Sequence, residues 1–459
     1  MVKSKLCFMW KINIAIFFQM LIIGVTQKYE CIRTAHIPAL RRNFRGRNTN
    51  MKCKRFVALA AAAALSVSAL AGCGSSSTAA SGSTATAGST AASAAGDKVV
   101  KIGVFEPSTG DSASGGKKEM LGMQYANSET PTVEIGGETY QVELVYADNG
   151  SSTDKAPSAA AELVSQGVSL VLGSYGSGVS IAGGPVFDDA GLAAIGVTCT
   201  NPNVTAGNDY YYRICFLDPF QGTVLANFAK DKFDAKVAYC LGETGNEYDQ
   251  GLIAYFTQAF EAAGGTVVTA SFPTNNSDFS TYLNQAKSEG ADVIFTPVSI
   301  AYATQILKQA SALGIDAAFL GSDTLDDNMV LDAAKGTDLQ LYVSTFYQEG
   351  GSPEFDEGVK AYINSNSEAL TNNGGNDTIA AVTAMGYDAY YVALEALKAA
   401  GSTDPAAVKA ALPSVTYDGV SGHIAFDEEG DAIRDTAYIK HSTNDGAWEL
   451  ETQQTVANQ

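Results

Sequence analysis

The sequence contains little histidine: three residues in 459, of which only His423 and His441 follow residue 73. A serine-hydrolase elbow is missing, because Tyr175 stands where Ser177 would need a preceding glycine. The glycine pair around Ser177 also lacks the third glycine of a dinucleotide-binding loop, because Ile181 stands in its place. There is no Walker A motif and no group of metal ligands with a recognisable spacing. We therefore expect no enzymatic activity, no metal and no cofactor.

Basic residues are scarce as well. The chain has 29 Lys and Arg against 49 Asp and Glu, a formal net charge of −20. Twelve of the basic residues lie in 1–72, so the rest of the chain has 17 basic and 48 acidic side chains. Such an excess repels nucleic acid and anionic headgroups and favours solubility in an exposed compartment. We expect no nucleic-acid partner.

Cysteine is also sparse in the part of the chain that should fold. Cys199, Cys215 and Cys240 are the three that follow Cys73, and they form neither a CxxC motif nor a zinc-ligand spacing. We expect small, buried apolar side chains at these positions. Whether two of them form a disulfide stays open at this point.

An export signal occupies the segment before Cys73. Basic residues at 52–55 precede an apolar stretch, 56–65, which leads to the small residues before the cysteine. Almost only Ser, Thr, Ala and Gly follow, from 74 to 96. This order is typical of a lipoprotein. We expect a signal peptide at 51–72, a lipidated Cys73, a flexible linker at 73–97 and an extracytoplasmic domain anchored to the membrane.

Residues 1–50 precede this complete signal, which starts at Met51. Their apolar segment, 12–25, contains polar residues and is too short to span a bilayer comfortably. We expect 1–50 to be a mis-annotated upstream extension and Met51 to be the true start.

Beyond the linker, strand patterns alternate with helix patterns. The expected strands cover 99–105, 140–146, 169–172, 192–197, 236–241, 266–271, 293–296 and 318–320. The expected helices cover 117–127, 155–166, 179–190, 249–263, 281–289 and 302–313. This alternation predicts an α/β fold with parallel sheets, and its two blocks, over roughly 360 residues, predict two lobes.

In such sheets, ligands bind beyond the carboxyl ends of the strands. The loops expected there are 106–116, 173–178, 198–203, 242–249, 297–301 and 321–327, each rich in Gly, Ser, Thr or Asp. Loop 173–178 opens a helix, so Ser177 either helps to bind a carboxylate or caps its own helix. Thr198 and Thr200 either offer a carbonyl, a hydroxyl and an amide to a ligand or form an ordinary turn.

Two residues of the second block have similar alternatives. Asp323 either pairs with an ammonium group in a crevice or caps a helix. Tyr248, at the start of a helix, either contacts a ligand or only packs.

Four segments together resemble the branched-chain amino-acid-binding proteins of ABC importers. These segments are Val100–Gly110, Tyr210–Gly222, Tyr248–Gly251 and Gly419–Gly430, in the same order as in the family. The resemblance covers nearly everything from about residue 99 to 449. It implies a type I periplasmic-binding-protein fold, two doubly wound lobes that close on a ligand and are joined by three crossovers, near 216–220, 343–347 and 417–422. Lobe 1 would be 98–217 plus 346–417, and lobe 2 would be 218–345 plus 418–455.

The resemblance also implies roles for five residues. Ser177 and Thr200 would hold a ligand α-carboxylate. The Thr198 carbonyl and the Asp323 carboxylate would take the ammonium group, and Tyr248 would close over the ligand.

Three departures from the family concern the ligand pocket. Gly115 replaces an aromatic lid of the side-chain pocket, Ser299 replaces a tyrosine, and Tyr175 replaces a smaller aliphatic residue. We expect a monomeric solute-binding lipoprotein that delivers an amino acid, branched-chain or related, to membrane permease subunits. A ligand-sensing receptor domain and a binder of another small carboxylate are the alternatives.

Overall fold

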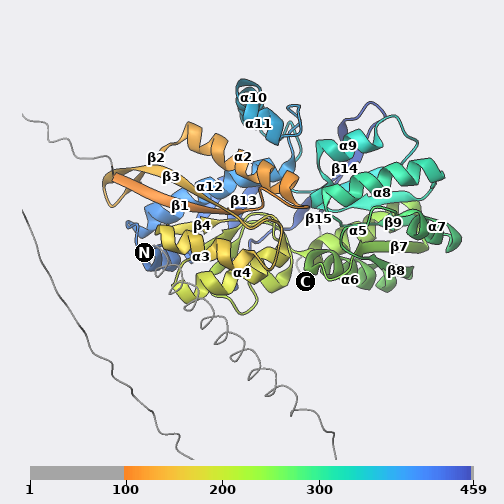
Figure 1. Cartoon of the computed structure of the whole chain (residues 1–459), viewed down its shortest axis with the longest axis horizontal. Coiled ribbons are helices and arrows are strands. Elements are labelled where there is room, and N and C mark those ends of the chain that lie inside the picture. The colour runs from red at the N-terminus through yellow and green to blue at the C-terminus, as the bar shows by residue number, and fades with distance from the viewer. Residues whose placement is uncertain (1–97, 456–459) are drawn as a thin grey trace, which may run out of the picture. The chain divides into compact units, whose positions relative to one another are not determined.

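The computed structural model describes residues 98–455 (Figure 1). The expected upstream extension, signal peptide, lipidated Cys73 and linker lie outside the described residues. Within 98–455, no helix is both long and apolar enough to cross a membrane. The described chain forms two α/β lobes, each built around its own sheet, which lie side by side in Figure 1.

The first sheet has the strand order β2-β3-β1-β4-β5-β6. Its strands are β1 (Lys98–Glu106), β2 (Thr132–Ile135), β3 (Glu138–Asp148), β4 (Leu170–Leu172), β5 (Ala194–Gly196) and β6 (Tyr211–Arg213). All neighbours are parallel except β2, which forms an antiparallel hairpin with β3 at the sheet edge. The short central strands are entirely buried, as expected for a parallel sheet covered on both faces.

The second sheet has the order β15-β14-β11-β10-β9-β7-β8. Its strands are β7 (Val237–Glu243), β8 (Thr266–Phe272), β9 (Val293–Phe295), β10 (Ala318–Gly321), β11 (Leu341–Thr345), β14 (Thr436–Ser442) and β15 (Trp448–Thr455). The five from β7 to β11 are parallel, and β14 and β15 add antiparallel strands at one edge. A separate hairpin is made by β12 (Thr416–Gly419) and β13 (Gly422–Ala425).

Helices cover both sheets (Figure 1). Those of the first lobe are α2 (Ala113–Glu129), α3 (Ala156–Gln166), α4 (Ser177–Ala190), α10 (Pro353–Ser365), α11 (Ser367–Asn372), α12 (Ala381–Ala400) and α13 (Pro405–Ala411). Those of the second lobe are α5 (Asp218–Phe233), α6 (Glu247–Ala262), α7 (Ser280–Ser288), α8 (Ile300–Leu313) and α9 (Asn328–Ala334). Short 3₁₀ turns occur at η1 (Pro202–Val204), η2 (Asp323–Leu325) and η3 (Leu412–Ser414).

The backbones of α2 and α12 touch where they cross. A Cβ atom on Gly122 would lie 2.0 Å from the carbonyl oxygen of Thr383, and one on Gly386 would lie 2.1 Å from that of Glu119. The two glycines therefore bring residues 381–400 against the first lobe, although α12 follows the five parallel strands of the second sheet in the sequence.

The structure confirms the alternating β/α order, with element ends shifted by a few residues. The expected loop 106–116 is shorter, because Glu106 belongs to β1 and α2 begins at Ala113. The chain passes between the sheets after β6, after β11 and between β13 and β14. The lobe boundaries depend on which segments move together on closure, so the predicted boundaries stay a prediction.

Candidate functional site

A cleft of about 500 Å³ lies between the lobes, beyond the carboxyl ends of strands from both sheets. Each of the six loops expected there contributes at least one lining residue. The first lobe supplies residues 111–112, 151–154, 175–179 and Thr198, and the second lobe supplies 243–249, Thr274, Ser299 and Thr324. Segment 151–154 and Thr274 were not expected from the sequence, although they too follow strands, β3 and β8.

Five of the seven predicted ligand-binding residues line this cleft. They are Tyr175, Ser177, Thr198, Tyr248 and Ser299. The other two, Thr200 and Asp323, are 0% and 1% exposed and lie behind the lining. The carbonyl of Thr200 accepts a hydrogen bond from the amide of Asp218 (3.0 Å), where α5 begins.

The start of α4 faces the cleft without a side-chain cap. Gly176 is its N-cap residue, and no side chain bonds to the amides of its first turn. The Ser177 hydroxyl instead accepts a hydrogen bond from the amide of Asn201 (3.2 Å), in the loop after β5. The interpretation of Ser177 as a cap of its own helix is therefore wrong. Amides at a helix start favour a bound anion.

On the second lobe, Tyr248 and Asp323 form a hydrogen-bonded pair. The Tyr248 hydroxyl donates to Oδ1 of Asp323 (2.7 Å), and Nε2 of Gln221 donates to the same oxygen (2.7 Å). The Asp323 carboxylate accepts from these side chains rather than from a helix amide, so the capping interpretation is wrong. Its Oδ2 atom is buried and has no partner within the described chain.

Tyr175 fills the space that Gly115 leaves. A Cβ atom on Gly115 would lie 2.2 Å from Cζ of the Tyr175 ring, so only glycine fits beneath it. The ring also packs against Ala380 and Val382. An aromatic side chain is therefore present next to Gly115, but it comes from the loop after β4 and not from α2.

Comparison with known proteins identifies the family of this chain. A family model described as periplasmic binding protein matches residues 99–447. The chain belongs to the periplasmic binding protein family. This membership confirms the resemblance expected from the sequence, and it is membership of a family that binds solutes and not of an enzyme family.

Individual relatives of this binding protein have names that refer to leucine, isoleucine, valine or branched-chain amino acids. A protein named Leu/Ile/Val-binding protein homolog 2, from Brucella abortus (strain 2308), is 28% identical over 337 residues, covering 72% of this chain and 87% of the relative. A leucine-binding protein of known crystal structure, LivK from Thermotoga maritima, is 30% identical, with a TM-score of 0.70. The match covers 78% of this chain and 99% of LivK. The substrate-binding protein LivJ from Streptococcus pneumoniae, in complex with isoleucine, is 26% identical, with a TM-score of 0.68 and the same coverage.

A pair of buried glutamates supports the cleft of this binding protein, and the sequence analysis missed it. Glu106, at the end of β1, accepts a hydrogen bond from the amide of Tyr175 (2.7 Å), and Glu119 of α2 accepts one from the Thr198 hydroxyl. Burial raises the pKa of Glu119 to about 8, and burial beside Glu119 raises the pKa of Glu106 well above its usual range. The two adjacent carboxyls favour a shared proton.

Two further carboxyls near the cleft are hard to ionise. Burial raises the pKa of Asp218 to about 7 and that of Asp323 to about 6. The guanidinium of Arg213 opposes the shift at Asp218, but its own donors bond Asp431 (2.6 Å) and the carbonyl of Cys199 (2.8 Å). A cation brought by a ligand would stabilise the ionised form of these carboxylates.

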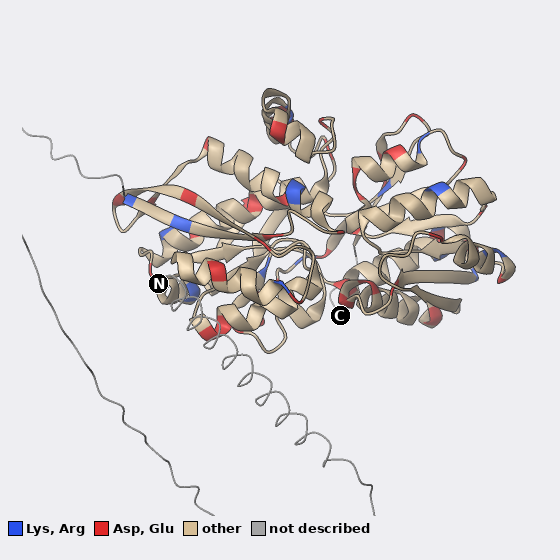
Figure 2. Cartoon of the chain, in the orientation of Figure 1, with Lys and Arg blue, Asp and Glu red and all other residues tan. Residues whose placement is uncertain are grey.

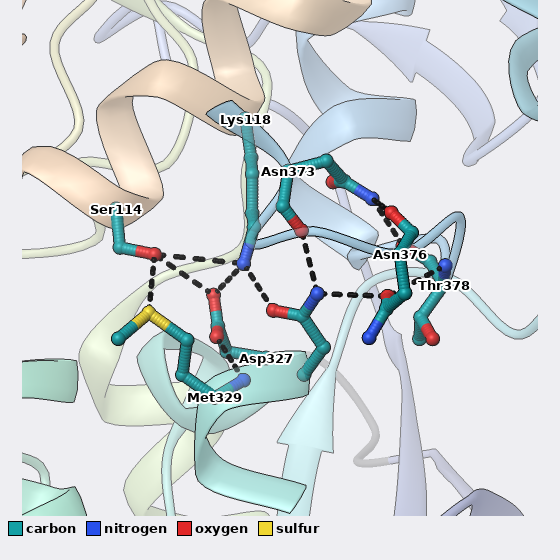
Figure 3. Close-up of polar contacts among 8 residues, drawn as sticks. Ser114, Lys118, Asp327, Met329, Asn373, Asn376 and Thr378 are labelled. Atoms are coloured by element: carbon teal, nitrogen blue, oxygen red, sulfur yellow. Dashed lines mark hydrogen bonds and ion pairs between the residues drawn. The ribbon is translucent and has the colours of Figure 1, made fainter. Parts of the chain in front are cut away.

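A buried cluster joins the lobes beside the cleft (Figure 3). Lys118 of α2 forms an ion pair with Asp327, just before α9, and donates to Oδ1 of Asn328 (2.8 Å). Nδ2 of Asn328 donates to the carbonyl of Asn373 (2.5 Å) and to Oδ1 of Asn376 (2.8 Å). Lys118, Asn373 and Asn376 of the first lobe therefore all bind residues at the start of α9 in the second lobe. We call these five residues the Lys118 cluster.

Two other expectations concern groups that bind metals or form crosslinks. Within the described part of the chain, no three His, Cys, Asp or Glu side chains gather to hold a metal ion. Cys199, Cys215 and Cys240 are free and buried, which answers the question left open by the sequence.

Proposed function

We propose that this binding protein captures an amino acid between its lobes, outside the membrane, and delivers it to the permease of an ABC importer. The observation that carries the proposal is the pairing of opposite chemistries across one cleft. Uncapped amides at the start of α4 face the cleft from the first lobe. Tyr248 lines the cleft from the second lobe, with Asp323 hydrogen-bonded behind it. The names of the relatives, which refer to leucine, isoleucine and valine, support the class of ligand.

The geometry suits the two charged groups of an amino acid. The α-carboxylate would accept hydrogen bonds from the α4 amides and the Ser177 hydroxyl. The ammonium group would pair with Asp323, whose Oδ2 has no partner among residues 98–455, and would donate to the Thr198 carbonyl. Thr200 would support the carboxylate side from beneath. Four charge-assisted hydrogen bonds of roughly 1.5–3 kcal/mol each, less the free energy of ordering and closure, give about micromolar affinity.

Closure of the two lobes over the ligand would link its capture to its delivery to the permease. The first lobe would bind the ligand weakly, and closure would bring Tyr248 and Asp323 onto it and exclude water. The permease would recognise the closed form, so the ligand shifts the population between two lobe angles.

The Asp323→Ala variant tests the ammonium site. It should weaken amino-acid binding by at least about tenfold, because it leaves a buried ammonium group without its counter-charge. Isothermal titration calorimetry measures the effect. Asp316→Asn is the control and should bind normally, because Asp316 is exposed and precedes β10, at the amino end of that strand and away from the cleft. Unchanged affinity of Asp323→Ala would remove this residue from the site.

The protein is proposed to act as a monomer attached to the membrane through diacylated Cys73, since two acyl chains suffice for stable anchoring. Mass spectrometry of the N-terminal peptide of the mature protein tests this. An unacylated peptide that begins elsewhere would contradict it.

A sensory receptor of the same fold is the second candidate, supported by the family fold alone. Transport predicts that the ligand-loaded protein stimulates ATP hydrolysis by a reconstituted permease, whereas sensing does not. Binding of a small carboxylate without an ammonium group would favour the third candidate, a carboxylate binder.

A further inference from the structure

The lining of the cleft is polar, and its ionisable carboxyl groups have no basic side chain beside them among the described lining residues. Among the described residues that line it, five are acidic and none is Lys or Arg. The acidic residues are Asp111, Asp154, Glu243, Glu247 and Asp249. Figure 2 shows acidic positions at the facing ends of both lobes. Pockets for small ligands are usually lined by apolar side chains, so this lining indicates an unusually polar ligand.

The apolar surface next to the cleft is already covered by the protein. The Tyr175 ring lies on Gly115 and against Ala380 and Val382. An aliphatic ligand side chain would therefore lie among hydroxyls and carboxylates, where it would displace water from polar groups without gaining apolar contact.

Three lining residues, Tyr175, Asp249 and Ser299, each have a buried polar atom that has no hydrogen-bond partner within residues 98–455. The Tyr175 side chain, in a residue 4% exposed, has an unpartnered hydroxyl, and Asp249, 1% exposed, has an unpartnered Oδ1 atom. A buried polar atom without a hydrogen bond is destabilising, so these atoms favour a ligand that carries several donors.

Carboxyl groups from opposite lobes line the same cleft. The hydroxyl of Tyr302 donates a hydrogen bond to Oε1 of Glu243 (3.3 Å). Burial raises the pKa of this hydroxyl to about 12, and the negative charges of Glu243 and Asp111 add to the shift. Asp111 belongs to the first lobe and Glu243 to the second. Two like charges that approach on closure repel each other unless a cation lies between them.

We infer that the captured ligand is a cationic amino acid, whose side-chain ammonium or guanidinium group binds between Asp111 and Glu243. This inference rests on the proposed amino-acid capture and replaces the branched aliphatic ligand of the named relatives with a basic one. The carboxylates also raise the local concentration of cations at the cleft.

Calorimetry with lysine, arginine, leucine and glutamate at neutral pH tests the inference. Lysine or arginine should bind at least about tenfold more tightly than leucine, and added salt should weaken that binding. Tighter binding of leucine would overturn this inference and leave the proposed function intact. Binding of no amino acid at all would overturn both.

Two variants test where the charged side-chain group of the ligand binds. Glu243→Gln and Asp111→Asn, one from each lobe, should each weaken binding of the cationic ligand by at least about tenfold. Asp316→Asn, which removes the same charge far from the cleft, should bind as the parent does. Because Asp111 is exposed, its variant should fold normally, and circular dichroism checks both. Parent-like affinity in both variants would overturn the inference.

Discussion

At the residue scale, the protein places carboxyl groups where water does not reach them. Glu106, Glu119, Asp218 and Asp323 are each at most 1% exposed, and burial raises the pKa of each one. A carboxyl whose pKa is raised by folding stabilises the protein below its unfolded pKa. This stabilisation is lost as the pH rises through the folded pKa.

The Glu119→Gln variant tests this relation. The pKa of Glu119 rises from 4.5 to about 8, so the ligand-free protein should lose stability as the pH rises from about 5 to 8. The substituted amide would keep an acceptor for Thr198 without a charge, so the variant should lose roughly 1–3 kcal/mol less over that range. Denaturant unfolding at both pH values measures this. Glu143→Gln, on an exposed strand position, is the control, and parallel pH profiles of all three proteins would contradict the prediction.

The sequence alone predicted the positions of the site loops better than their contacts. Ser177, Thr198 and Tyr248 were found because parallel strands deliver their following loops to one edge. The Glu106–Glu119 pair was missed, because a strand end and a helix interior meet only through packing. The burial of Thr200 and Asp323 behind the lining also depends on tertiary contacts that a local pattern does not encode.

At the element scale, α2 combines several functions. Gly115 makes room for the Tyr175 ring, Lys118 reaches the second lobe, Glu119 bonds to Thr198, and Gly122 touches the backbone of α12. One helix therefore links the cleft wall, the contact between the lobes and the core of the first lobe.

The Gly122→Ala variant tests the close crossing of α2 and α12. In an isolated helix this change stabilises by up to about 1 kcal/mol. Here the new methyl group would lie 2.0 Å from the carbonyl oxygen of Thr383, so the helices must separate. We expect a loss of about 1–3 kcal/mol in the free energy of unfolding. Chemical denaturation measures the difference, and an increase in stability would disprove the close contact.

Most of the strands and helices that alternate along the chain were predicted, but β6, β11, α5 and α9 were not. The antiparallel edge strands β2, β14 and β15 were not predicted, nor were helices α10 to α13. The strands are half-exposed and contain many polar residues, so their pattern resembles that of a loop. The helices follow the second block, so the alternating pattern does not assign them to the first lobe. The family resemblance did, by placing 346–417 in lobe 1.

At the scale of the whole molecule, the Lys118 cluster is a contact that exists only when the lobes meet. Lys118 and Asp327 are 209 residues apart in sequence, and their side chains are 1% and 2% exposed. Opening the cleft would separate them and return both charges to water. The cluster therefore contributes to the balance between open and closed forms without touching the ligand.

The Lys118→Met variant should weaken ligand binding by at least about tenfold, because closure would bury Asp327 without its partner. Small-angle scattering should show a larger radius of gyration for the variant in the presence of ligand. Lys117→Met, one residue earlier in α2, is the control. The double variant Lys118→Met with Asp327→Leu should recover much of the affinity, and a double variant as weak as the single one would contradict this explanation.

The three cysteines of the described residues have a practical consequence. All are buried, and burial raises the pKa of Cys199 to about 11, so these thiols react slowly at neutral pH. A cysteine introduced on the surface of each lobe would then be the preferred site for maleimide dyes. Energy transfer between two such dyes would follow the angle between the lobes in real time and turn the molecule into a fluorescent reporter of its own ligand.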